Sequence, residues 1–184
     1  LLIFLAMSFG KDPRALDSPL VGKPAPNFAL RGLDGELVHL EDLRGKVVPI
    51  YFGFTHCPDV CITSLGNIAA GLKQLSDQER AQIQPVFITI DPERDDPARV
   101  GEYARYFDPS FVGLTGSLEA VTKVAKSHFV IFEKVPLDDS DMGYTMDHSS
   151  IIYVVGKDGV IRSLIRHGET PAGIAKTLRE ALAG

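Results

Sequence analysis

The chain has 184 residues, of which 45% are hydrophobic and 23% are charged. These values describe a single globular domain and exclude a disordered or fibrous protein. The 19 Lys and Arg residues against 24 Asp and Glu give a formal net charge of −5. With no basic run, the sequence lacks the clustered cations on which nucleic-acid binding depends, so we expect no nucleic-acid partner. Two cysteines are too few for a disulfide-stapled scaffold, but they suffice for one redox pair or one metal site.

The N-terminal residues differ in composition from the rest of the chain. Residues 1–9 form an apolar run much shorter than the ~20 residues that span a bilayer. We interpret them as the end of a truncated membrane anchor or signal segment. Residues 10–26 are rich in Gly, Pro and charge, which predicts a linker. The globular domain is then expected to occupy residues 27–184 and to lie outside the cytoplasm, where thiols can be oxidised.

The first half of the domain is predicted to alternate strands and helices. Apolar and polar side chains alternate over residues 27–40 around Asp34-Gly35, which predicts a β-hairpin. Apolar runs predict buried strands at residues 46–53, 84–90 and 111–114. Helices are expected at residues 60–75, from Asp96-Pro97 onward and at residues 117–127, the last two with an Asp or Ser N-cap.

The second half is predicted to begin with a strand at residues 128–135 and a loop at residues 136–147. A hairpin over residues 150–165 turns at Gly156–Gly159, and Thr170-Pro171 begins the last helix. This order predicts an α/β protein whose mixed central sheet is flanked by helices on both faces and preceded by a β-hairpin. That arrangement is typical of the thioredoxin-like fold.

Both cysteines lie where a predicted strand runs into a predicted helix, in the sequence Cys57-Pro-Asp-Val-Cys61. We expect Cys57 near the helix N-cap, where the helix dipole and unpaired N–H groups favour a thiolate. Since Cys61 follows four residues later, the two side chains share a helix face and can form a disulfide or ligate one metal ion. Three intervening residues, one more than thioredoxin-type reductases usually have, favour the metal site.

His148 is the candidate third ligand. It precedes the strand at residues 150–155, in a loop that a thioredoxin-like sheet brings back against the cysteines, and Ser149 rather than Pro follows it. Two thiolates and an imidazole form a soft donor set that suits Cu(I). Cu(II) can use the same set with an added weak ligand, and Zn(II) also accepts Cys₂His, so the donor types leave the metal open.

Other polar and sulfur-bearing residues near this site are weaker candidates. Asp147 is a candidate to orient His148, and Asp59 to set the local field beside the thiolates. Met142 and Met146 are soft thioethers for which we expect ordinary packing. Structural or surface roles are expected for the other histidines, His39, His56, His128 and His167.

Three motifs together resemble the Sco/SenC family of membrane-anchored, thioredoxin-like copper proteins. They are residues 51–61 (YFGFTHCPDVC), residues 90–95 (IDPERD) and residues 147–149 (DHS). The resemblance runs from about Val21 to the final helix and implies that Cys57, Cys61 and His148 ligate copper. Ile62 stands where the family usually has Pro, a change that touches none of these ligands.

The resemblance implies a metallochaperone that helps to assemble the binuclear copper centre of cytochrome c oxidase. Subunit II of the oxidase is then the expected partner, with another copper chaperone as a candidate donor. The alternative is a thiol-disulfide reductase in which Cys57 attacks and Cys61 resolves, so that the oxidase cysteines stay reduced. In both cases the expected location is a membrane, with the domain facing the periplasm or, alternatively, the mitochondrial intermembrane space. A thiol peroxidase is disfavoured because Thr55 stands too close to Cys57 for the usual Thr-x-x-Cys motif.

Overall fold

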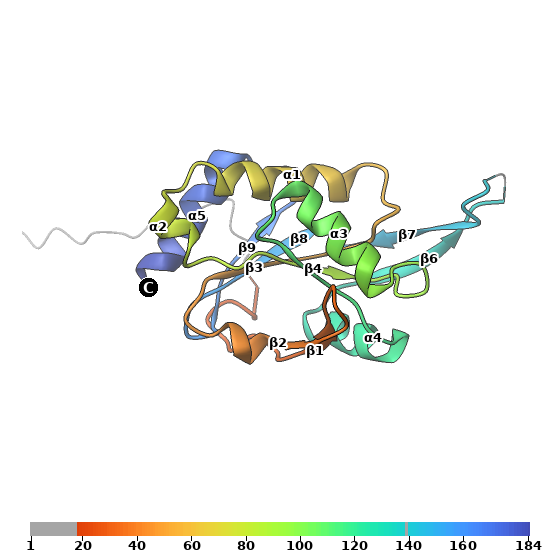
Figure 1. The fold of residues 1–184 in the computed structure, drawn as a ribbon, viewed down its shortest axis with the longest axis horizontal. Helices are drawn as coiled ribbons and strands as arrows, with labels where there is room; N and C mark the ends of the chain where they lie inside the picture. The colour runs from red at the N-terminus through yellow and green to blue at the C-terminus, as the bar shows by residue number, and fades with distance from the viewer. Residues whose placement is uncertain (1–17, 139) are drawn as a thin grey trace, which may run out of the picture.

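The computed structural model describes residues 18–138 and 140–184 (Figure 1). The predicted anchor or signal segment at residues 1–9 and the first part of the predicted linker lie outside these ranges. The rest of that linker runs beside the C-terminal hairpin, where Gly22 N–H donates to Ile161 O and Ala25 N–H to Gly159 O, both at 2.8 Å. Over the described ranges, the structure contains no helix with the length and apolar character of a membrane span.

A five-stranded mixed sheet forms the centre of the domain, in the order β5-β4-β3-β8-β9. Its parallel part pairs β3 with β4 and β4 with β5, whereas β8 pairs antiparallel with β3 and with β9. Every residue of β3 and β4 is buried, as expected for apolar strands covered on both faces. The predicted mixed sheet is thereby confirmed. The strands are β3 (Val48–Gly53), β4 (Val86–Thr89), β5 (Val112–Leu114), β8 (Ile151–Val155) and β9 (Ile161–Arg166).

Helices cover both faces of this sheet, as predicted (Figure 1). The parallel connections β3-α1-β4 and β4-α3-β5 place α1 and α3 on one face, where α5 packs beside α1. The opposite face carries α4 and the predicted hairpin of β1 and β2. These elements are β1 (Ala29–Arg31), β2 (Leu37–His39), α1 (Val60–Leu72), α3 (Pro97–Phe107), α4 (Leu118–Ser127) and α5 (Pro171–Ala183).

The predicted helix starts are confirmed at three N-caps. Asp96 accepts a hydrogen bond from Arg99 N–H at 2.8 Å, and Ser117 and Thr170 each accept one from the residue three positions on, at 3.1 Å. Two short helices were not predicted, η1 (Leu40–Leu43) and α2 (Asp77–Arg80). The second has a capping box between Ser76 and Glu79 that the sequence itself contains.

The loop prediction for residues 136–147 is wrong at its C-terminal end. Residues Tyr144–His148 form a strand, β7, that pairs antiparallel with β6 (Phe132–Pro136). This hairpin projects from the side of the domain (Figure 1). The Asp- and Gly-rich sequence before β7 is typical of a loop, and Tyr144–His148 becomes a strand through its pairing with Phe132–Pro136.

Candidate metal centre

The two cysteines lie on either side of the start of α1. Helix α1 has Asp59 as its N-cap and begins at Val60. Cys57 stands two residues before this N-cap, near it as expected, and Pro58 and Asp59 still belong to the loop that follows β3. Cys57 is therefore in that loop and Cys61 is in the first turn of the helix, with 6% and 0% of their surfaces exposed.

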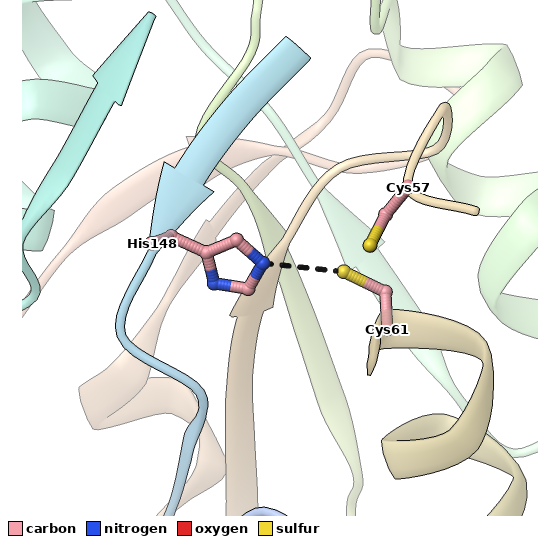
Figure 2. Close-up of side chains that lie close together, drawn as sticks. All are labelled: Cys57, Cys61 and His148. Atoms are coloured by element: carbon pink, nitrogen blue, oxygen red, sulfur yellow. Dashed lines mark hydrogen bonds between the residues drawn. The ribbon is translucent and has the colours of Figure 1, made fainter. Parts of the chain in front are cut away.

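The structure brings the three predicted donors together. The ligand atoms of Cys57, Cys61 and His148 all lie within 4.8 Å of one another, and Cys61 Sγ is 3.4 Å from His148 Nε2 (Figure 2). Two sulfurs on opposite sides of one metal would be about 4.6 Å apart at ordinary bond lengths. Donors this close can converge on one ion after small side-chain rotations. The sulfurs are not joined in a disulfide.

His148 is held at the end of β7 by two aromatic rings and one carbonyl. The rings of Tyr51 and Phe54 meet the imidazole edge to face, with centroids 6.3 and 5.9 Å away. The other ring nitrogen, Nδ1, lies 3.2 Å from Ser149 O. When Nδ1–H donates to this carbonyl, Nε2 presents its lone pair to the thiols, which is the form that binds a metal.

Asp147 and Asp59 do not contact the three donors through their carboxylates in any interaction that the structure describes. Asp147 is exposed and, as the neighbour of His148 on a strand, points to the opposite face. Asp59 is exposed at the N-cap of α1, and its backbone N–H, not its side chain, hydrogen-bonds to Cys57. The orienting contact predicted for Asp147 is made by the carbonyl of Ser149.

The two thiols have very different acidities. A hydrogen bond from Cys61 lowers the pKa of Cys57 to about 4, against the effect of burial, and the backbone N–H groups of Asp59 and Cys61 act in the same direction. The hydrogen bond to Cys57 and burial raise the pKa of Cys61. The hydroxyl of Tyr51 lies 3.9 Å from Cys61 Sγ and, because it is buried, also has a raised pKa. Near neutral pH the pair is thus one thiolate and one thiol.

This asymmetry predicts the pH dependence of alkylation in the reduced, metal-free protein. The reactive species is the Cys57 thiolate, so the rate with iodoacetamide should rise through a midpoint near pH 4 and be flat above about pH 6. In a Cys57→Ser control, Cys61 loses the sulfur that contributes most to its raised pKa, but it stays fully buried. This variant should therefore react much more slowly than wild type at neutral pH, because burial alone still disfavours the thiolate and restricts access of the reagent. A midpoint in the ordinary thiol range near pH 8.5 would contradict the assignment.

Within the described residues, the other histidines do not join the cluster of the three donors. His56 is 3.8 Å from Asp95, His128 is buried with Nδ1 2.9 Å from Val124 O, and His167 Nδ1 is 3.0 Å from Ser64 Oγ. His39 ends β2, on the far hairpin. Met146 is 7% exposed and packs in the core, while Met142 is 41% exposed on the β6–β7 hairpin.

Asp95 supports the site and was not singled out by sequence reasoning. Its side chain is fully buried and accepts hydrogen bonds from Thr55 N–H at 3.0 Å, Thr55 Oγ1 at 2.5 Å and Thr89 Oγ1 at 2.6 Å. These bonds tie the loop that carries Cys57 to the end of β4. The signal was present, because Asp95 ends the motif at residues 90–95, but burial cannot be read from that motif.

Gly53, the last residue of β3, leaves room for the sulfur of Cys61. A Cβ at this position would lie 2.7 Å from Cys61 Sγ and 3.0 Å from the ring of Phe87. A Gly53→Ala variant should therefore lose about 1–3 kcal/mol of stability in urea denaturation and bind metal more weakly, because Sγ must move. Gly66→Ala is the control, since nothing lies within 4 Å of its Cβ, and it should be neutral or stabilising. Equal stability of the two variants would contradict this role.

Comparison with known proteins identifies the family to which the chain belongs. The SCO1/SenC family model matches residues 19–183. A SCO2-like protein of Rickettsia prowazekii is 38% identical over 165 residues, which are 86% of this chain and 78% of that protein. The mitochondrial SCO1 homolog of Homo sapiens is 38% identical over 171 residues, or 90% of this chain and 56% of that protein.

A solved structure, that of Bradyrhizobium japonicum ScoI with copper bound, is also similar. It has 39% identity and a TM-score of 0.77 and covers 86% of this chain and 99% of that one. These matches agree with the thioredoxin-like fold and with the cluster of Cys57, Cys61 and His148. The chain therefore belongs to the SCO1/SenC family.

Proposed function

We propose that this protein is a copper metallochaperone that assists assembly of the binuclear copper centre of cytochrome c oxidase. The observation that carries the proposal is the cluster of Cys57 Sγ, Cys61 Sγ and a His148 ring nitrogen within 4.8 Å. Two thiolates and one imidazole are the donors that Cu(I) prefers, and Cu(II) can use them with one further weak ligand. Copper bound to the similar Bradyrhizobium protein supports copper over zinc.

Copper is the cargo in this proposal, and the residues hold and release it by ligand exchange. Binding requires Cys61 to lose its proton, because a thiolate and not a thiol ligates the metal. Cys57 retains slight exposure, whereas Cys61 has none. His148 is partly exposed. An incoming thiolate of the acceptor therefore reaches the metal from the side of Cys57 and His148, and Cys61 releases the metal last.

A thiol-disulfide reductase is the second candidate, and the unequal acidities of Cys57 and Cys61 favour it. The Cys57 thiolate would attack a disulfide of the acceptor, breaking that S–S bond and forming a mixed disulfide. Cys61 would then lose its proton and attack Cys57 Sγ, which releases the second acceptor thiolate. The acceptor gains two electrons, and a Cys57–Cys61 disulfide forms.

The acceptor in both cases is subunit II of the oxidase, with another copper chaperone as the candidate donor. The proposal places the protein at a membrane, with the domain facing the periplasm or the equivalent intermembrane space. The human relative is a mitochondrial protein, which is consistent with the second compartment.

A transfer experiment with the soluble copper domain of an oxidase subunit II separates the two functions. The Cu(I)-loaded protein is mixed with the reduced, metal-free acceptor, and copper on each protein is measured after separation. In a parallel reaction the reduced, metal-free protein is mixed with the oxidised acceptor, and acceptor thiols are counted. Copper transfer that is lost in Cys57→Ser supports the chaperone. Thiol formation without copper transfer identifies the reductase. If the protein carried out neither reaction, both proposed functions would be wrong.

A further inference from the structure

The loop that follows β4, residues 91–95, lies between the two halves of the candidate metal centre. One half is the loop with Cys57, to which Asp95 is bonded through Thr55. The other half is the β6–β7 hairpin, which ends in His148. A second set of contacts joins the same loop to this hairpin, and its members are Asp91, Arg94 and Tyr144.

Arg94 is the centre of this second set. Its Nε donates to Asp91 Oδ2 at 2.5 Å, and its Nη1 donates to the carbonyl of Tyr144 at 3.0 Å. Its guanidinium carbon also lies 3.7 Å from the centroid of the Tyr144 ring. The hydroxyl of Tyr144 donates to Asp91 Oδ1 at 2.8 Å. Asp91, Arg94 and Tyr144 thus contact one another pairwise, and we call them the Asp91–Arg94–Tyr144 clamp.

Asp91 and Arg94 of the clamp are largely shielded from water, and Tyr144 is partly exposed. Asp91 is 2% exposed and the Arg94 side chain is 17% exposed. Charge-assisted hydrogen bonds and a cation–π contact are stronger in such surroundings than at an exposed surface. By contrast, Glu93 in the same loop pairs with Lys134 of the hairpin where both side chains are about half exposed, at 50% and 44%, and such pairs contribute little.

The hairpin depends on attachments of this kind. Strands β6 and β7 form a two-stranded sheet of their own, separate from the central sheet, and an isolated two-stranded hairpin is only marginally stable. Tyr144, Met146 and His148 alternate along β7 and therefore share one face. Met146 is buried in the core. The clamp at Tyr144 and the packing of Met146 therefore both fix the register of β7, and with it the face on which His148 lies.

We propose that the Asp91–Arg94–Tyr144 clamp is a positioning device that holds β7, and with it His148, within ligand distance of Cys57 and Cys61. The inference rests on the proposed copper binding and adds residues that act on the metal through His148. Loss of the clamp leaves the two thiols in place, because Cys57 is carried by the β3–α1 loop, which Asp95 anchors, and Cys61 by α1. The same loss lets the imidazole of His148 move away from the thiols. Without the clamp β7 can slip, and a strand that slips by one residue turns its side chains to the other face.

The test compares Arg94→Gln and Tyr144→Phe with Glu93→Gln as the matched control in the same loop. Cu(I) affinity is measured by competition with a chelator, and the Cys57–Cys61 midpoint potential is measured in thiol buffers. Arg94→Gln should weaken copper binding about 10- to 100-fold, the range found for residues that orient a metal-bound His. Tyr144→Phe should have a smaller effect in the same direction and guards against misfolding of the first variant. Glu93→Gln should stay within about twofold of wild type, and all three variants should still form and reduce the Cys57–Cys61 disulfide.

A double-variant comparison distinguishes positioning of His148 from a general loss of structure. In a His148→Ala background, Arg94→Gln should cause no further loss of copper affinity, since its effect passes through the imidazole. An equal loss in both backgrounds, or wild-type affinity in Arg94→Gln, would overturn the clamp. Failure of the wild-type protein to bind copper would instead overturn the proposed function. In that case hydrogen exchange of the metal-free protein tests whether the clamp holds β7. Arg94→Gln should speed exchange at the amides of β7 and not at those of β3, and unchanged exchange at β7 would contradict the role of the clamp.

Discussion

Replacing His148 with Ala should weaken Cu(I) binding by more than about 100-fold, since even the loss of a group that only orients a metal-bound His costs about 10- to 100-fold. The ring nitrogen that faces Cys61 Sγ at 3.4 Å is lost, and two sulfurs remain. The Cys57–Cys61 pair should still be oxidised to a disulfide and reduced again, because neither sulfur is carried by β7. Chelator competition measures the copper affinity, and titration in glutathione buffers measures the redox activity of the pair.

His39→Ala is the matched control for that experiment, because His39 ends β2 on the far hairpin. It should leave both copper affinity and the thiol potential at their wild-type values. If His148→Ala bound copper as tightly as wild type, His148 would be removed from the ligand set. If His148→Ala lost the redox activity of the cysteine pair together with copper binding, the separation of the two functions would be wrong.

Replacing Asp95 with Ala should lower the free energy of unfolding by about 3 kcal/mol or more. The change leaves the donors of Thr55 and Thr89 without their acceptor, and each buried unpaired group costs about 1–3 kcal/mol. Since Thr55 precedes the metal site by two residues, the loop that carries Cys57 should also become mobile. Urea denaturation monitored by circular dichroism gives the stability change, and the m-value tests for two-state unfolding.

Asp96→Ala provides the comparison for that change. Asp96 is the exposed neighbour, and its side chain accepts one hydrogen bond, from Arg99 N–H. Loss of such an N-cap costs about 1 kcal/mol. A loss for Asp95→Ala that is no larger than the loss for Asp96→Ala would show that the buried carboxylate does not anchor the loop.

The central fold could be predicted because its signals are local. The strands β3 and β4 are continuous apolar runs, and the helix starts at Asp96, Ser117 and Thr170 carry cap residues whose hydrogen bonds the structure describes. The strand β7 could not be predicted in this way. Its residues do not form a strand alone and do so only against β6, at a register that joins Phe132 to His148.

The donors of the candidate site were accessible from sequence, but their support was not. Cys57 and Cys61 are close in the chain, and the topology of the predicted sheet brings His148 to them. The contacts that hold these donors join residues far apart in sequence, such as Asp95 with Thr55 and Asp91 with Tyr144. Neither a spacing rule nor a propensity encodes such pairs. The sequence therefore predicted the chemistry of the site better than the geometry that supports it.

The most direct test of copper binding is a Cu(I) titration of the reduced protein in the presence of a competing chelator, with Zn(II) and the Cys57→Ser variant in parallel. We expect one tightly bound Cu(I) per chain, weaker Zn(II) binding, and loss of tight copper binding in Cys57→Ser. Copper binding no tighter than that of an ordinary pair of thiols, or unchanged binding in Cys57→Ser, would contradict this expectation.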